Sequence, residues 1–153
     1  MHWAQKTPDV DEVVEHHRRL VEEHGMSVVH VRGDETGPSL THTVGLSLRD
    51  GQAELVVSGL EMAVSFPLLG LATQQVLSGR RLVAGDQLSD IGPVPVRLEP
   101  VSHPERMVVL QAMYAVDGPP IPLLQLVWQD DLGQWPWEVD HEECCRPRYV
   151  EQL

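Results

Sequence analysis

The segment His42–Leu60, HTVGLSLRDGQAELVVSGL, constrains the fold of this chain more than any other. Two apolar runs of strand length flank Arg49-Asp50-Gly51 within it. An Asp-Gly pair between β-prone runs is a strong hairpin signal, because glycine accepts the positive φ that a tight turn requires. We therefore predict a central hairpin of two antiparallel strands that the rest of the chain covers.

Two predicted helices flank this hairpin in the sequence. Residues 10–24 repeat apolar and histidine side chains at steps of three and four, with acidic residues at the start and Gly25 at the position of a left-handed C-cap. A second helix is expected over residues 60–78, with a broad apolar face formed by Leu68, Leu69, Leu71, Ala72, Val76 and Leu77. Pro67 within it favours either a kink or a main helix that starts near Ser65, because proline has no N–H to donate.

The remaining segments combine one helix with strands. The run Ser102-His103-Pro104-Glu105 matches a capping box and predicts a third helix over residues 103–116, while the Val-Val-Leu inside it also suits a strand. Residues 93–101 alternate like a strand, but their prolines restrict it to an edge or an irregular position. Further strands are predicted at 26–32, 40–48, 53–58 and 123–128, with a possible short one at 81–84.

These elements predict an α+β fold. Their order favours an antiparallel meander, so we expect a mainly antiparallel sheet of four to six strands with two or three helices packed on one face. A chain of 153 residues fits one domain with its own core. We expect a single globular domain over 1–153, in which residues from about 139 to 153 form a polar C-terminal tail.

The charge balance is strongly acidic, with 11 Lys and Arg against 23 Asp and Glu and a net charge of −12. This balance opposes binding to nucleic acid and to anionic membranes, because both require excess cations. It suits a protein partner with a basic surface, although many proteins are acidic simply because charge keeps them apart in solution.

Several features bear on the compartment in which the chain acts. No apolar run approaches the ~20 residues of a membrane span, and the N-terminus lacks the apolar segment of a signal peptide. Cys144 and Cys145 are adjacent and form no disulfide framework. We therefore expect a cytoplasmic protein that is not associated with a membrane.

Four segments resemble a bacterial family of uncharacterised proteins, domain of unknown function 4262. They are HGMSVVHV, GPSLTHTVGL, AELVVSGL and LLQLVWQDDLGQWPWE, and the resemblance extends over nearly the whole chain. TVGL, ELVVSGL and the QLVW…D…G…PW pattern are its most recognisable pieces. The resemblance implies a bacterial α+β domain and assigns a catalytic role to no residue.

Two histidines are the first candidates for a ligand site. His30 and His42 fall on neighbouring predicted strands, so they face each other across the sheet if both side chains point the same way. Such a pair would contribute to a metal site or, when protonated, bind an anion. A metal needs three or four ligands, so we assign no metal site and no cofactor. The run from His141 to Cys145 also lacks the second cysteine pair of a zinc site.

Tryptophans cluster around the turn that follows the last predicted strand. Trp128, Trp135 and Trp137 form either a wall for a planar ligand or partner side chain, or a cap on the open end of the core. A nucleophile elbow, a phosphate loop and a dinucleotide-binding motif are all absent, so no catalytic residue is assigned. The residues indicated as ligand-binding are His30, His42, Gln125, Trp128 and Trp137.

Hypotheses of different classes follow. The first is a small acidic binding or accessory module, similar to a bacterial immunity protein, that docks a partner protein with a basic surface. The alternative is an enzyme or ligand-binding protein for a small molecule, with a pocket near His42 and Trp128, and the third is a metal-binding protein that uses its histidines. We favour a binding protein over an enzyme. The sequence specifies neither the ligand nor the oligomeric state.

Overall fold

The structure is a computed structural model that describes residues 9–35, 37–49, 51–92, 95–129, 132–138 and 153. Its helices are α1 (Val10–His24), α2 (Met62–Leu77) and α3 (Val108–Tyr114), with short 3-10 turns η2 (Leu46–Leu48), η3 (Pro104–Arg106) and η4 (Pro136–Glu138). Its strands are β1 (Ser27–Val31), β2 (Leu40–Val44), β3 (Glu54–Ser58), β4 (Gln87–Leu88), β5 (Val96–Pro100) and β6 (Leu123–Trp128).

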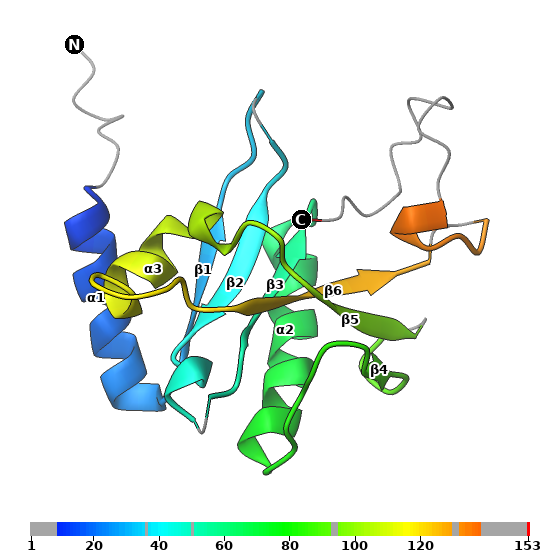
Figure 1. The fold of residues 1–153 in the computed structure, drawn as a ribbon, viewed down its shortest axis with the longest axis horizontal. Helices are drawn as coiled ribbons and strands as arrows, with labels where there is room; N and C mark the ends of the chain where they lie inside the picture. Colours follow the sequence, from blue (N-terminus) through cyan, green and yellow to red (C-terminus); the bar gives the residue numbers. More distant parts are fainter. Residues whose placement is uncertain (1–8, 36, 50, 93–94, 130–131, 139–152) are drawn as a thin grey trace.

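The strands form one mixed sheet in the order β1-β2-β3-β6-β5-β4 (Figure 1). All neighbouring pairs are antiparallel except β3 and β6, which run parallel. The last strand in the sequence therefore lies in the middle of the sheet. The predicted single α+β domain with a mainly antiparallel sheet is confirmed, but the meander covers only β1, β2 and β3.

The predicted hairpin forms, with a longer connection than expected. β2 and β3 pair antiparallel in a register that sets Thr41 opposite Val57 and His42 opposite Val56. β2 ends at Val44, however, and the chain passes through η2 before it reaches Gly51, which has a φ of 74°. Asp50 lies outside the described residues. The Asp-Gly signal thus located the reversal correctly, while the apolar residues before it form a 3-10 turn instead of extending the strand.

The helices cover both faces of the sheet, so the expectation of a single covered face was wrong. α2 packs with Leu55, Val57, Leu98 and Leu126 on one face. α1 and α3 pack with Val29, Val44, Val56 and Leu123 on the other. Successive strand residues point to opposite faces, and every residue of β3 is buried. A central strand that is buried on both sides requires helices on both sides.

The predicted first and second helices form with nearly the expected limits. α1 ends at the C-cap Gly25, whose φ of 85° and N–H bond to the Val21 carbonyl (2.8 Å) complete the last turn. α2 starts at Met62 and continues through Pro67, so it has no delayed start at Ser65. None of the described helices has the length and apolar character needed to cross a bilayer.

The later elements depart more from their predicted limits. The segment with the capping-box pattern forms η3, and only Val108–Tyr114 is α-helical, because Met107 has a non-helical ψ of 74°. Glu105 bonds to the His103 ring instead of closing the box. The short strand lies at Gln87–Leu88 and not at 81–84, and it pairs with β5, which is therefore one strand in from the edge.

Candidate functional site

The outer face of α2 is the most unusual surface of the described chain. Its sixteen residues include no charged side chain. A helix that is apolar on all sides is normally buried, yet several of its large apolar side chains are exposed. The exposed fractions are 52% for Met62, 53% for Val64, 40% for Phe66 and 49% for Leu71.

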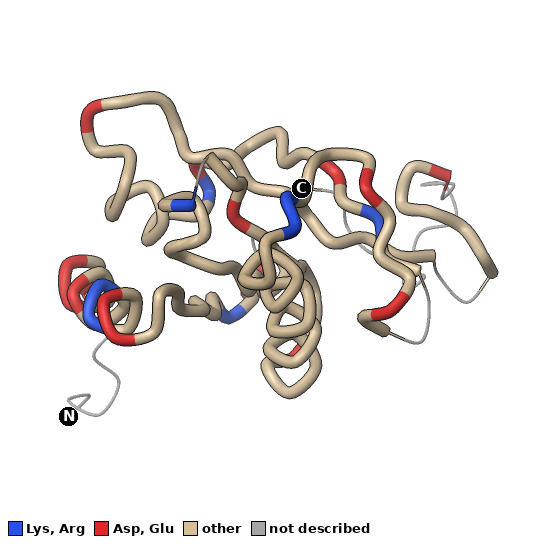
Figure 2. Tube along the Cα trace, turned by 90° about the horizontal axis from the view of Figure 1, so that it is seen from below, with Lys and Arg blue, Asp and Glu red and all other residues tan. Residues whose placement is uncertain are grey.

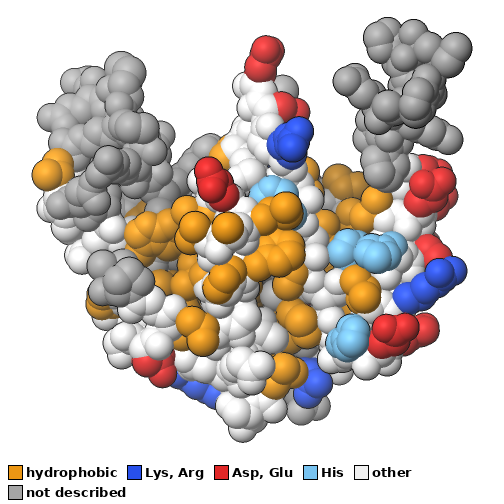
Figure 3. All heavy atoms as spheres, turned by 180° about the vertical axis from the view of Figure 1, so that it is seen from behind, with side chains coloured by type: hydrophobic (Ala, Val, Ile, Leu, Met, Phe, Trp, Pro, Cys, Tyr) orange, Lys and Arg blue, Asp and Glu red, His pale blue; other side chains and the backbone are white. Residues whose placement is uncertain are grey.

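These side chains form one apolar surface, the α2 face. Figure 3 looks at this side of the molecule and shows hydrophobic side chains gathered at its centre, with charged side chains around the margin. In Figure 2 acidic residues mark α1 and the loops, whereas the coil of α2 carries no charge. An exposed apolar patch with a polar rim is typical of a binding surface.

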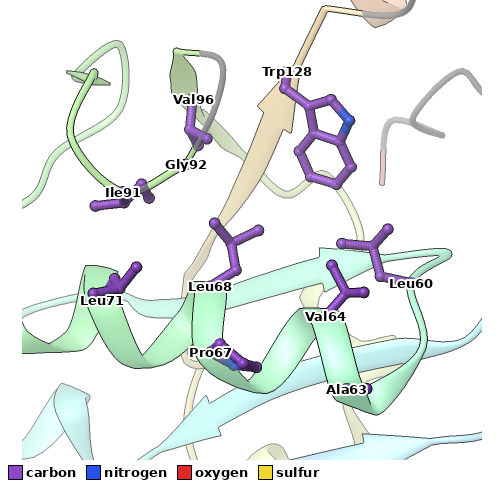
Figure 4. A pocket seen from close by; sticks show the side chains of 10 residues that line it. All are labelled: Leu60, Ala63, Val64, Pro67, Leu68, Leu71, Ile91, Gly92, Val96 and Trp128. Atoms are coloured by element: carbon purple, nitrogen blue, oxygen red, sulfur yellow. The ribbon is translucent and has the colours of Figure 1, made fainter.

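The α2 face is hollowed along one side into a groove of about 460 Å³. The groove lies between α2 and the end of β6, where the Trp128 ring lies over the helix (Figure 4). None of its described lining residues is charged. They are Leu60, Ala63, Val64, Pro67, Leu68, Leu71, Ile91, Gly92, Val96 and Trp128.

Acidic residues stand beside both walls of the groove. Glu61 directly follows the lining residue Leu60 and is the N-cap residue of α2. Asp90 directly precedes Ile91 on the opposite wall and accepts a hydrogen bond from the Gln75 side chain (3.1 Å). Both carboxylate residues are exposed. The groove is therefore an apolar channel with negative charge at its edges.

His30 lies at the margin of the α2 face, not in the groove. Its Nδ1 is 2.7 Å from Thr41 Oγ1, and the buried Ser65 hydroxyl of α2 donates to the same Thr41 oxygen (3.0 Å). The His30 ring also contacts the Phe66 ring edge to face, with centroids 6.5 Å apart. This network ties β1, β2 and α2 together, which explains His30 as a structural residue.

His42 is buried on the opposite face, with 1% of its surface exposed. Its Nδ1–H donates to the Thr43 carbonyl oxygen (3.0 Å), which leaves Nε2 as an acceptor that has no partner. Burial lowers the pKa of His42 from 6.5 to about 4, and the nearby His17 acts in the same direction, while the Thr43 carbonyl opposes them. His42 is therefore neutral at physiological pH.

The sheet register explains why the two histidines do not meet. His30 pairs with Thr41, while His42 pairs with Val29. Because side chains alternate between the faces, this offset of one residue places the two rings on opposite sides of the sheet. The hypothesis of a facing histidine pair was wrong for this reason.

Gln125 lies on the same face as His42 and is also buried. Val56 of β3 stands between them, because it pairs with His42 on one side and Gln125 on the other. The Gln125 Oε1 atom accepts the backbone N–H of Leu153 (2.8 Å), and the Leu153 carbonyl oxygen accepts the N–H of Ser102 (3.1 Å). Gln125 thus holds Leu153 against the sheet.

The tryptophans do not form one wall. Trp128 packs on the α2 side of the sheet, whereas Trp137 stacks on Trp135 with centroids 5.4 Å apart and an interplanar angle of 2°. The Arg97 guanidinium lies 5.2 Å from the centre of the Trp137 ring, and its Nε is 2.7 Å from Glu99 in an ion pair without hydrogen-bond geometry. Arg97 alternates with Val96, so this stack lies across the sheet from the groove.

The structure therefore does not assemble the predicted pocket. Of His30, His42, Gln125, Trp128 and Trp137, only Trp128 lines the groove, and the other four are distributed over both faces of the sheet. A ligand-binding role for Trp128 stays a prediction. The groove residues of α2 were predicted as a helix with a broad apolar face, but sequence alone did not show that part of this face is exposed.

Glu54 is a second residue that the sequence analysis did not single out. Its fully buried carboxylate accepts hydrogen bonds from the backbone N–H groups of Gly45, Leu46 and Ser47 and from the hydroxyls of Thr43 and Ser47, at 2.7–3.1 Å. A lone glutamate at the start of the apolar run ELVVS was the available signal. Five donors compensate the burial of this charge, so Glu54 fixes η2 and has no lone pair directed at a ligand site.

Gly45 is required at this turn for two reasons. Its φ of 106° disfavours any residue with a side chain, and a Cβ here would lie 3.0 Å from the Gly25 carbonyl oxygen. The glycine of the TVGL segment thus lets η2 pack against the end of α1.

A metal centre is not evident in the part of the chain that the structure describes. No three histidine, cysteine, aspartate or glutamate side chains there are grouped so that they could hold an ion. The predictions that concern His141, Cys144, Cys145 and the polar tail before Leu153 fall outside the described residues. The described residues therefore provide no ligand set that supports the metal-binding hypothesis.

Comparison with known protein families identifies the family of this chain. The model of the family "Domain of unknown function (DUF4262)" matches residues 20–142. No curated protein and no solved structure matches the chain. The family match spans β1 to η4 and includes both the α2 face and the Glu54 turn, in agreement with the resemblance that the TVGL and ELVVSGL segments indicated. The chain belongs to the DUF4262 family.

Proposed function

We propose that this chain is a bacterial, cytoplasmic binding module that docks a partner protein on the α2 face. The observation that carries the proposal is a charge-free helix that exposes large apolar side chains beside a groove. Full burial of one such side chain is worth about 1.5–3 kcal/mol, so covering several half-exposed ones yields several kcal/mol of binding energy.

The charge distribution favours a partner segment with basic flanks. The α2 face is neutral, but Glu61 and Asp90 adjoin the groove and the chain as a whole carries −12. A partner that presents an apolar strip between lysines or arginines would fill the groove and pair with these carboxylates. Such charges mainly increase the rate of association and the selectivity, while the apolar contacts supply the affinity.

Binding accounts for the groove better than catalysis does. Its described lining residues offer no titratable side chain, and general acid–base or nucleophilic catalysis requires one within reach of the substrate. The buried titratable groups Glu54 and His42 do not line the groove and are enclosed in the core. The chemistry of the groove is thus limited to apolar contact and to backbone or indole hydrogen bonds.

A labelled synthetic amphipathic peptide, with leucines on one helical face and lysines on the other, tests the proposal by fluorescence anisotropy. We expect saturable binding that weakens as NaCl rises, because salt screens the charged rim. V64Q and L71Q should each weaken binding about tenfold or more. V116Q is the matched control, since Val116 is 76% exposed and lies outside α2.

Two results would contradict this function. The first is equal binding of a peptide in which glutamates replace the lysines, which would remove the role of the acidic rim. The second is a V116Q variant that weakens binding as much as V64Q, which would show that the α2 face is not the contact surface. A variant with both E61Q and D90N should keep the affinity at high salt and lose most of the salt dependence.

A small apolar molecule is the second candidate occupant. The groove volume of about 460 Å³ falls in the ≈ 300–1,000 Å³ range of small-molecule pockets, and Trp128 supplies an aromatic wall. Nile red, a neutral apolar dye, distinguishes the two candidates. If the dye binds tightly and the lysine peptide fails to displace it, the site serves a small molecule, whereas displacement supports the protein partner.

A further inference from the structure

A second cavity lies at the C-terminal end of α2, away from the groove, and has the opposite character. It measures about 290 Å³ and is lined by Arg49, Arg80 and Arg81, together with Gln52 and the end of the helix. The whole chain contains only 11 lysines and arginines against 23 acidic residues. Three guanidinium groups around one small cavity are therefore a local reversal of the overall charge.

These arginines come from two segments that fold together. Arg49 follows η2, whereas Arg80 and Arg81 follow α2, and Figure 1 shows both segments at the same end of the molecule. The guanidinium of Arg81 approaches within 3.9 Å of the Cβ position of Gly51 in the first segment. The cluster is thus a product of the tertiary fold and not of a basic run in the sequence.

A buried glutamine holds the two segments in place. The Gln52 amide donates to the carbonyl oxygens of Ala53 (3.0 Å) and Leu82 (3.1 Å), and its Oε1 accepts the Leu82 N–H (3.0 Å). Gln52 is 4% exposed and uses its amide N–H groups and its carbonyl oxygen in this clamp. Arg81 directly precedes Leu82, so its backbone is fixed beside the cavity by a buried, satisfied polar group.

No carboxylate among the described residues forms an ion pair with these three guanidinium groups. The ion pairs among the described residues involve Arg18, Arg19, Arg97 and two histidines, but none of the three arginines at this cavity. The Arg80 side chain donates to Gln75 Oε1, a neutral acceptor. All three arginines are exposed, so their charge is accessible to a ligand in solution.

We propose that this arginine cavity binds a small polyanion that carries two or more phosphoryl or carboxylate groups. Planar guanidinium groups recognise the oxygens of phosphate and carboxylate through paired N–H donors. Three of them match a multiply charged anion better than a single charge. The cavity is lined by no aromatic ring among its described residues, so it offers no stacking surface for a nucleobase.

A structural role for the same arginines is the competing explanation. α2 ends at Leu77 beside the cavity, and α1 ends at Gly25, whose Cβ position lies 3.3 Å from Arg49 Nη2. Cations near helix C-termini stabilise the helix dipole. Such a role predicts a loss of stability on substitution without any effect on anion binding, and direct titration separates the two explanations.

Isothermal titration of the full chain with pyrophosphate, citrate and inorganic phosphate tests the proposal. We expect pyrophosphate or citrate to bind saturably and more tightly than inorganic phosphate, with the difference between the first two identifying the phosphoryl or carboxylate source. R80Q and R81Q should each reduce the affinity about tenfold. R81K should reduce the affinity less than R81Q does, because lysine keeps the positive charge and lacks only the paired N–H donors of the guanidinium group.

The matched control is R18Q, because Arg18 is an exposed arginine that pairs with Glu15 on α1. Urea unfolding of every variant measures the helix-end contribution separately. Absence of saturable heat with pyrophosphate and citrate, or an equal loss of affinity in R18Q and R81Q, would overturn the proposal. Unfolding changes without binding changes would assign the arginines to the helix ends and overturn it as well. The lysine-peptide test of the α2 face is independent of each of these outcomes.

Discussion

At the scale of single residues, His42 and Glu54 show two ways in which this core accommodates a titratable group. At Glu54, five donors satisfy the buried carboxylate. His42 has one hydrogen bond and an unpartnered Nε2, so burial instead favours its neutral form. The difference follows from the backbone, because η2 turns its N–H groups towards Glu54, whereas the His42 ring has the Thr43 carbonyl oxygen as its hydrogen-bond partner.

The neutral state of His42 makes the stability of the fold dependent on pH. Its pKa is about 4 in the folded chain and 6.5 in the unfolded one, so between these values the unfolded state binds more protons. The contribution of neutral His42 to the free energy of unfolding is complete above pH 6.5, its pKa in the unfolded chain. This contribution is lost as the pH falls towards about 4, its pKa in the folded chain. The full loss is about 3 kcal/mol, and about 2 kcal/mol is lost by about pH 5.

Urea unfolding of wild type and H42L at neutral and acidic pH measures this contribution. The wild type should lose about 2 kcal/mol more than H42L between neutral pH and about pH 5, because the variant has no imidazole to protonate. H24L serves as the control, since the His24 side chain is 66% exposed. An H42L variant with the same pH dependence as the wild type would contradict the prediction.

Residue-scale features were the least accessible from sequence. The residue types at His30 and His42 drew attention to both, but their faces depend on a register that a shift of one residue reverses. Glu54 was visible only as a polar residue at the start of an apolar run. Its role depends on donors from a 3-10 turn that no local pattern predicted, since LSLRDG reads equally well as the end of a strand.

At the scale of elements, sequence was more informative because caps and periodicity act locally. α1 formed within its predicted limits, since its acidic start, its periodic face and Gly25 all agree. α2 was correctly predicted as apolar, but periodicity describes burial only when an opposite, polar face exists. This helix has no such polar face, so its sequence does not show which side faces solvent. The packing of α2 against the sheet and β6 decides that side.

Pro67 is an unfavourable residue for stability within α2. It cannot donate to the Ala63 carbonyl oxygen, and it lies on the exposed side of the helix, where it lines the groove. We expect P67A to raise the free energy of unfolding by about 1–3 kcal/mol. Urea unfolding followed by far-UV circular dichroism measures the change.

The same helix supplies the control for this substitution. A Cβ at Gly70 would meet no atom within 4 Å, so G70A should stabilise the helix by about 0.5–1 kcal/mol through backbone entropy alone. P67A should therefore raise the free energy of unfolding more than G70A does. If P67A instead lowers the free energy of unfolding, the ring of Pro67 contributes packing that outweighs the missing hydrogen bond. That result would contradict the prediction that Pro67 is unfavourable for stability.

At the scale of the whole molecule, the sheet consists of two halves that meet at one pair of strands. β1, β2 and β3 form one half and β6, β5 and β4 the other, joined by the parallel β3–β6 pair. A local signal predicted the β2–β3 hairpin, but not this junction, because the junction brings Glu54–Val56 against Leu123–Gln125 across the intervening helices. The position of the last strand in the middle of the sheet is therefore a non-local result.

This topology makes β6 the strand on which both halves depend. Leu126 is fully buried and packs in the cluster that contains α2, β3 and β5. We expect L126A to lower the free energy of unfolding by about 2–5 kcal/mol, because it leaves a cavity at this junction. Tryptophan fluorescence reports the half with Trp128, and histidine ring NMR signals report the half with His30 and His42.

The two signals should shift to lower urea by the same amount in L126A and remain coincident, because neither half retains a covered sheet face without the other. L132A is the control, since Leu132 is 65% exposed and its truncation should leave both transitions near those of the wild type. Separate transitions would mean that β1–β3 with α1 holds its own core. The parallel β3–β6 pair would then be a contact between two folding units and not the centre of one.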